Sequence, residues 1–199
     1  HVNWSLQDSR GNNLMAAGKK PAERLRFLAF LTAFLQGMYH HNDLIAASMA
    51  SAGNELRLGG HEAPPAVISV HMGEEFQNLL QDPWGFVTRP CGRRDSLILE
   101  GGLVPPIPCD LSDRNRTSPV AYTGNKFEFR MVGSSASIAF PLTAINLAVS
   151  DGMARVRTAL EGIRGQEQQV EVLGRLLREA WPVVFDGDNY GDAWKAECV

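Results

Sequence analysis

The residues with the clearest capacity for chemistry lie in the segment KFEFRMV, where charged and apolar side chains alternate strictly. Alternate side chains of a strand point to opposite faces, so Lys126, Glu128 and Arg130 share one face. There a carboxylate can hold a cation while the basic groups bind phosphate or carboxylate. A solvated outer sheet face carries similar charges, and spacing alone favours that interpretation. Lys126 is, however, the only lysine between Lys20 and Lys195, which shifts the balance toward a site.

Further charged residues fall in sequence that is typical of loops. DRNRTSP puts Arg114 and Arg116 on one side of an extended segment, where guanidinium groups suit phosphate oxygens, and pairing with nearby aspartates is equally compatible. RLGGHEAPP places Arg57 and Glu62 around Gly-Gly and Pro-Pro steps that exclude a helix, so we expect either a solvated loop or a lid that presents a carboxylate. His1, in HVNWS, carries little weight alone.

The elements that position these residues follow from apolar spacing. Residues 1–20 predict one strand that enters a loop, and residues 21–38 predict a helix so apolar that it must be buried on more than one side. A shorter helix, capped at Asn42 or Asp43, ends before Gly53. The glycine-rich residues 53–140 predict loops and short strands in PPAVISVHM and SLILE, a helix in GEEFQNLLQ and a loop in DPWGFVTRPCGRRD.

Helical spacing returns at the end of the chain. It begins at Pro141, and a further helix ends at Pro182. This mixed order predicts an α+β fold rather than a parallel βαβ sheet.

Composition excludes several classes of protein. The 199 residues are 44% hydrophobic and 21% charged, which suits one compact domain and excludes disordered and collagen-like chains. The net charge of −3 provides no overall positive field, so we expect neither nucleic acid nor a membrane as partner. The three cysteines form no CxxC pair, which fits a reducing compartment. The chain shows no signal peptide, and we expect an internal piece of a longer, cytoplasmic protein.

Taken in order, five blocks of this sequence resemble the catalytic region of type III glutamine synthetases: HVNWS, SAGNELRLGGHEAPPAVIS, DRNRTSP, GNKFEFRMVGSS and VVFDGDNYGDAW. The resemblance covers nearly all of residues 1–199. It implies an α+β fold in which an antiparallel-sheet catalytic domain of the glutamine synthetase type is flanked by helices. It also implies truncation at both ends, without the N-terminal domain and the first part of the catalytic domain.

The resemblance further implies an ATP-dependent carboxylate-amine ligase. Such an enzyme joins ammonia to L-glutamate through a γ-glutamyl phosphate, uses Mg²⁺ or Mn²⁺, and assembles as a cytoplasmic homo-oligomer. We expect this fragment alone to be inactive. The roles implied for single residues are catalytic (Glu62, Arg116), substrate-binding (Arg57, Arg130), ATP-binding (Asn3, Ser5, Lys126) and metal-binding (His1, Glu128).

Some positions depart from the family pattern. SPVAYTG lacks a cation that type I enzymes carry, while Leu56 and His61 stand where type III sequences have His and Asn. The acidic cluster that supplies most metal ligands in the family lies outside this chain. Two alternatives therefore stay open: ligation of another amine to glutamate by a related enzyme, and a non-catalytic oligomeric relative.

Overall fold

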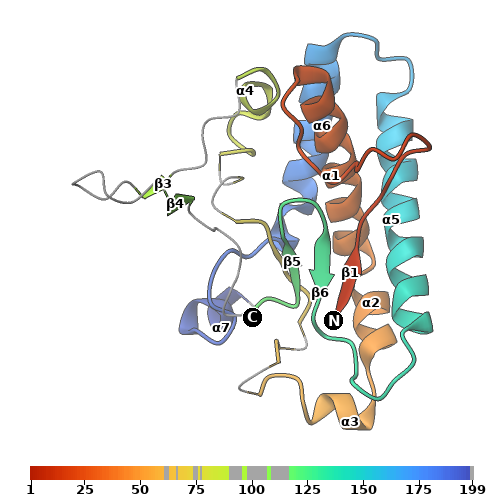
Figure 1. Ribbon diagram of the computed structural model, residues 1–199, viewed down its shortest axis with the longest axis vertical. Coiled ribbons are helices and arrows are strands. Elements are labelled where there is room, and N and C mark those ends of the chain that lie inside the picture. The colour runs from red at the N-terminus through yellow and green to blue at the C-terminus, as the bar shows by residue number, and fades with distance from the viewer. Residues whose placement is uncertain are drawn as a thin grey trace.

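The computed structural model describes residues 1–60, 63–65, 67–73, 76, 78–89, 96–97, 107–108 and 117–197. A small sheet lies against a layer of helices (Figure 1), which confirms the predicted α+β class. The sheet contains β1 (Val2–Trp4), β2 (Val70–His71), β5 (Val120–Tyr122) and β6 (Phe127–Phe129), and a separate pair is formed by β3 (Ser96–Leu97) and β4 (Ile107–Pro108). The helices are α1 (Pro21–His40), α2 (Asn42–Met49), α3 (Ala52–Glu55), α4 (Pro83–Thr88), α5 (Ala139–Leu160), α6 (Gln166–Ala180) and α7 (Asp192–Glu197), with a 3-10 turn over Trp181–Val183.

The four strands have the order β1-β6-β5-β2. β6 pairs antiparallel with β1 on one side and with β5 on the other, as the resemblance implied, but β2 joins β5 in parallel. Residues 72–119 separate β2 from β5, and a connection of that length can return the chain to the same end of the sheet. The tight β5–β6 turn places Gly124 at φ +90°, a conformation that favours glycine.

α1 is the central helix of the layer. Pro21 stands in its first turn, where the missing N–H costs nothing, and the Glu23 carboxylate accepts hydrogen bonds from the backbone N–H groups of Lys19 and Lys20 at 3.0 and 3.1 Å. Every residue from 31 to 38 is buried, which confirms the predicted burial on more than one side. Phe34 stacks on Phe127 of the sheet with ring centroids 3.6 Å apart, while α5 and α6 cover the other sides.

Two glycines let α1 and α5 approach closely. A Cβ atom on Gly37 would lie 2.5 Å from the carbonyl oxygen of Ala148, and one on Gly152 would lie 2.9 Å from the Gly37 nitrogen and still closer to the carbonyl oxygen of Ala33. Real side chains do not tolerate such distances to backbone atoms. The crossing of these helices therefore depends on both glycines.

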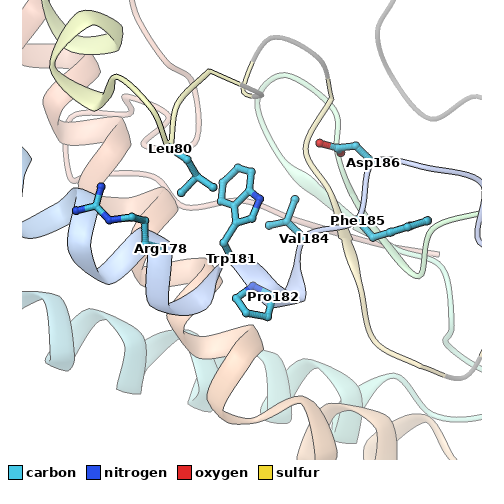
Figure 2. A pocket seen from close by; sticks show the side chains of 7 residues that line it. All are labelled: Leu80, Arg178, Trp181, Pro182, Val184, Phe185 and Asp186. Carbon is cyan, nitrogen blue, oxygen red and sulfur yellow. The ribbon is translucent and has the colours of Figure 1, made fainter. Parts of the chain in front are cut away.

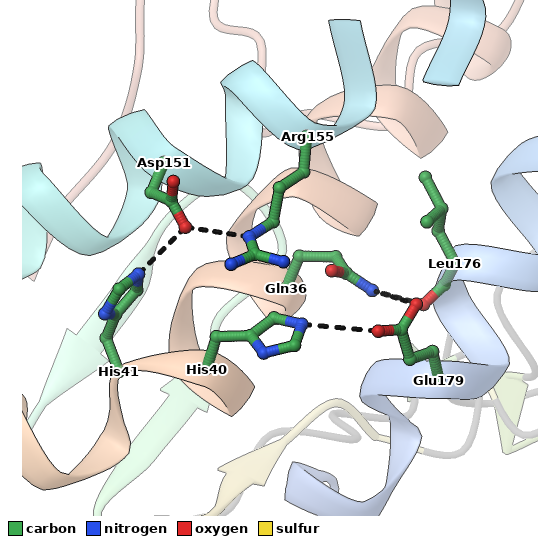
Figure 3. A network of polar contacts seen from close by, with 7 residues as sticks. All are labelled: Gln36, His40, His41, Asp151, Arg155, Leu176 and Glu179. Carbon is green, nitrogen blue, oxygen red and sulfur yellow. Dashed lines mark hydrogen bonds and ion pairs between the residues drawn. The ribbon is translucent and has the colours of Figure 1, made fainter. Parts of the chain in front are cut away.

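Ionisable side chains connect the end of α1 to the neighbouring helices (Figure 3). His41 Nε2 lies 2.9 Å from Asp151 Oδ2 on α5, and this oxygen also accepts a 2.8 Å hydrogen bond from Arg155 Nε. His40 Nε2 lies 3.4 Å from Glu179 Oε1 on α6. The hydrogen bond from Arg155, followed by that from His41, lowers the pKa of Asp151 below its ordinary value.

Several elements match the predictions and others do not. The predicted helices around 21–38, after Pro141 and before Pro182 are confirmed as α1, α5 and α6. The predicted loop in DPWGFVTRPCGRRD is wrong in part, because Pro83–Thr88 form α4. Asp82 caps this helix by accepting a 2.7 Å hydrogen bond from Gly85 N–H. Residues 78–81, within the predicted helix GEEFQNLLQ, form turns instead.

No helix in the described ranges is both long and apolar enough to cross a membrane. The three cysteines, Cys91, Cys109 and Cys198, lie outside those ranges.

Candidate active site

The outward side of strands β1 and β6, with the residues next to their ends, gathers four of the predicted site residues: His1, Asn3, Glu128 and Arg130. Asn3 lies opposite Glu128 in the strand register, while the neighbouring Phe127 and Phe129 are fully buried against the helices. The side chain of Glu128 therefore projects from the opposite face of the sheet. Its Oε1 lies 2.7 Å from His1 Nδ1, and its Oε2 accepts a 3.1 Å hydrogen bond from Arg130 Nε.

The surroundings of these charges differ from a solvated outer face. Arg130 is only 3% exposed, and the side chain of Glu128 is 19% exposed. A buried guanidinium needs a charged partner, because losing hydration without compensation is costly. Glu128 provides that charge and keeps its other oxygen directed at His1. The simpler interpretation of the KFEFRMV pattern therefore does not describe this face.

The pair His1 and Glu128 is chemically suited to a divalent cation. A carboxylate oxygen and an imidazole nitrogen lie side by side, and Mg²⁺ and Mn²⁺ accept such donors. Within the described ranges, no group of three or more His, Cys, Asp or Glu side chains is placed to hold a metal ion. The two residues thus fit as part of a ligand set.

The other residues predicted for this region lie along β1 and its end, beside the β5–β6 turn. Ser5 Oγ lies 3.1 Å from both Asn13 Oδ1 and the carbonyl oxygen of Asn125, and so joins the end of β1 to that turn. Asn3 is exposed. Lys126 is half-buried, and in the described part of the chain its ammonium group has no ion-pair partner. Asn3, Ser5 and Lys126 thus lie along one edge of the face that carries Glu128.

Arg57 lies just after α3 and reaches the end of β6. Its Nη2 donates to the carbonyl oxygens of Met131 and Val132 at 3.1 and 2.9 Å, and its Nε donates to Asn54 Oδ1 at 3.0 Å. Ser51 caps α3 by accepting a 3.2 Å hydrogen bond from Asn54 N–H. Arg57 is therefore hydrogen-bonded to backbone carbonyl groups of the segment that directly follows Arg130.

The remaining predicted residues, Glu62 and Arg116, lie outside the described residues, as do His61 and Arg114. The residues on either side of positions 61 and 62 are described. Tyr190 Oη lies 2.5 Å from the carbonyl oxygen of Gly60 and also within hydrogen-bond distance of that of Ala63. Burial raises the pKa of Tyr190.

The segment that contains Tyr190 is fixed beside β2. Phe185 N–H donates to the carbonyl oxygen of Val70 at 3.1 Å, and Asp186 Oδ1 accepts from the N–H groups of Met72 and Gly73 at 2.6 and 2.9 Å. These contacts extend the sheet edge with the block VVFDGDNYGDAW. The sequence resemblance included that block without assigning it a role.

Sequence reasoning missed Asn54 and Tyr190. Both lie inside the blocks that carry the family resemblance, but neither residue type is charged or metal-binding. Their importance arises from partners that are more than 70 residues away, namely Met131 for Asn54 and Gly60 for Tyr190. The local signal for Asn54 is weak: it is an asparagine in a short capped helix, three positions before an arginine that follows the helix.

A pocket of about 580 Å³ lies apart from this face, between the end of α6 and residues 184–186 (Figure 2). Its lining includes Trp181, Arg178 and Asp186. The Asp186 oxygen that bonds Met72 and Gly73 is already occupied by the backbone. Arg178 and Asp186 are the two charged residues among the seven that line the pocket, and the other five are apolar.

Comparison with known proteins gives a consistent result, although no family model matches the chain. It is 40% identical over 199 residues to "Type-3 glutamine synthetase" of Dictyostelium discoideum, covering 98% of this chain and 27% of that protein. It is 40% identical over 207 residues to "Glutamine synthetase" of Bacteroides fragilis (strain YCH46), covering 100% of this chain and 28% of the relative. For "Glutamine synthetase" of Butyrivibrio fibrisolvens the identity is 34% over 203 residues, with 100% and 29% covered. The chain thus spans less than a third of the length of these relatives.

Proposed function

This chain belongs along its whole length to the glutamine synthetase family, and on that premise we propose that it forms part of the catalytic domain of a longer glutamine synthetase, called the complete enzyme below. The complete enzyme joins ammonia to L-glutamate with consumption of ATP, through a γ-glutamyl phosphate, and releases glutamine. It works as a cytoplasmic homo-oligomer. Identity of 34–40% over the whole chain supports this proposal.

The observation that carries the proposal is the position of Glu128 between His1 and Arg130. A carboxylate with one oxygen toward an imidazole and the other toward a buried guanidinium is suited to a site for phosphates and a divalent cation. His1 and Glu128 would hold Mg²⁺ or Mn²⁺, and the ion would supply positive charge that stabilises the ATP phosphates. Arg130 fixes the orientation of Glu128 and balances its charge.

The other residues surround this centre. Asn3, Ser5 and Lys126 bind the nucleotide at the edge formed by β1 and the β5–β6 turn. Arg57 binds a carboxylate of glutamate. Its Nη1 group is available for this contact, since it has no partner among the described residues. Glu62 closes over the acyl phosphate and helps hold ammonium, and Arg116 neutralises the phosphoryl group during transfer.

The test is Glu128→Ala in the complete enzyme, with Glu171→Ala, an exposed glutamate of α6, as the matched control. We expect Glu128→Ala to abolish ATP-dependent glutamine formation and to weaken Mn²⁺ binding measured by titration calorimetry without nucleotide. Glu171→Ala should retain both properties. Near-normal glutamine formation by Glu128→Ala at saturating Mg²⁺ would refute the assignment.

A further inference from the structure

Asn54 is a buried polar residue to which no role has been assigned so far. We propose that Asn54 is a positioning residue for glutamate binding, because its side chain holds Arg57 in the orientation that presents the open end of the guanidinium group to a carboxylate. The proposal rests on the proposed function, in which Arg57 binds glutamate. It adds a residue that touches neither substrate nor metal and acts through its neighbour.

The side chain of Asn54 has little freedom. The residue is 3% exposed, and its Nδ2 donates to the carbonyl oxygens of Met49 and Met131 at 2.6 and 2.7 Å. The remaining atom, Oδ1, accepts the 3.0 Å hydrogen bond from Arg57 Nε. Both Nδ2 hydrogens are used, so the amide cannot turn without leaving buried carbonyl groups unsatisfied.

The three nitrogens of the Arg57 guanidinium group differ in their contacts. Nε and Nη2 face Asn54 and the carbonyl oxygens of Met131 and Val132, whereas Nη1 has no partner in the described ranges. A carboxylate can therefore approach only the Nη1 side without competing with the protein. Asn54 determines which edge is occupied, since its Oδ1 is the acceptor for Nε.

Both side chains bind the same carbonyl oxygen, that of Met131, which has two lone pairs to accept them. Met131 directly follows Arg130, whose guanidinium group contacts Glu128. Asn54 and Arg57 thus fix α3 to the end of β6 and place the glutamate arginine in constant relation to the Glu128 face. A guanidinium group that is already ordered loses less rotamer freedom when substrate binds.

The experiment compares Asn54→Ala with Ser51→Ala in the complete enzyme. We expect Asn54→Ala to raise the KM for glutamate by about tenfold, while kcat and the KM for ATP change by less than about threefold, because a binding interaction is lost equally in the ground and transition states. Ser51→Ala removes the cap of the same short helix but no contact to Arg57, so its melting temperature falls and its glutamate KM stays unchanged.

The second arm is a double-mutant cycle with Arg57→Ala. If Asn54 acts through Arg57, adding Asn54→Ala to Arg57→Ala does not raise the glutamate KM further. Additive effects, or an unchanged glutamate KM in Asn54→Ala beside a raised one in Arg57→Ala, would overturn the positioning role. An unchanged glutamate KM in Arg57→Ala itself would instead overturn the proposed function of Arg57, so the two failures are distinguishable.

If Asn54→Ala does not give folded protein, Asn54→Ser takes its place. The serine hydroxyl can still satisfy a buried carbonyl group but is too short to reach Arg57 Nε. The expected rise in glutamate KM, and the outcomes that overturn the proposal, are the same for this variant.

Discussion

Single residues at this site combine a structural contact with a group left for a ligand. Glu128 uses one carboxylate oxygen to pair with Arg130 and turns the other to His1, and Arg57 binds two carbonyl groups with one nitrogen while Nη1 remains available in the described ranges. Removing either side chain therefore changes stability together with function. Kinetic constants and melting temperatures need to be read together for these positions.

Arg57→Ala should raise the KM for glutamate by about 10- to 100-fold with little change in kcat, because a hydrogen bond to a charged group contributes roughly 1.5–3 kcal/mol. The melting temperature should fall by several degrees as the carbonyl groups of Met131 and Val132 lose a donor. Steady-state kinetics of the complete enzyme and thermal unfolding measure the two effects. Arg175→Ala, at an exposed position of α6, is the control. A lower melting temperature with an unchanged glutamate KM would leave Arg57 only its structural contacts.

The sequence was informative about which residues share the Glu128 face, because strict alternation in KFEFRMV specifies two faces of a strand. It did not reveal that Arg130 is almost completely buried, since burial depends on what packs around a strand end. Asn54 could not be singled out at all. Its partners Met49, Arg57 and Met131 come together only when α3 meets the end of β6.

At the scale of elements, the helices were more predictable than the strands. Apolar residues at steps of three and four defined α1 and α5 because long helices repeat their pattern many times. β2 has only two residues, so its sequence contains almost no periodic signal. The sequence did not predict α4 because Pro83 and Gly85 made the segment resemble a loop. In the structure Asp82 caps the helix, and Pro83 stands in its first turn, where proline is tolerated.

Gly152→Ala tests the close crossing of α1 and α5. The new methyl group would overlap backbone atoms of Ala33 and Gly37, which cannot move independently of their helix. We expect a loss of about 1–3 kcal/mol and a fall in melting temperature of roughly 3–10 °C.

Gly53→Ala on α3 is the matched control, because no atom lies within 4 Å of the added Cβ. Calorimetry of both variants should give a normal or slightly higher melting temperature for Gly53→Ala. Equal melting temperatures for the two variants would mean that α1 and α5 accommodate the added methyl group without a loss of folding stability.

At the scale of the whole molecule, ion pairs at the end of α1 connect it to α5 and α6, and one of them makes stability depend on pH. Arg155 and His41 lower the pKa of Asp151 in the folded protein. The resulting stabilisation is complete above the ordinary aspartate pKa of about 4 and is lost as pH falls through the lower folded-state value. The carboxylate is 41% exposed, which keeps the effect small.

Asp151→Asn should therefore lower the melting temperature by about 1–3 °C at pH 6, and the difference from the unmodified protein should shrink steadily as the pH falls below the ordinary aspartate pKa of about 4. Glu171→Gln, at an exposed position without a described ion pair, should show no such convergence. Thermal unfolding measured between pH 2.5 and pH 7 checks both variants, with pH steps of about 0.5. A constant difference across that range would assign the effect of Asp151→Asn to packing rather than to charge.

The pairing of β1 with β6 has a consequence for biosynthesis. His1 and Glu128 are 127 residues apart in the chain, and at roughly 5–20 residues per second a ribosome needs on the order of ten seconds to deliver the second after the first. During that interval Val2 and Trp4, which are buried in the finished sheet, have no strand to join, whereas α1 and α2 can form from contacts within themselves. Nascent β1 must therefore remain unaggregated and unpaired until β6 emerges, and closure of this long loop should be slow compared with helix formation.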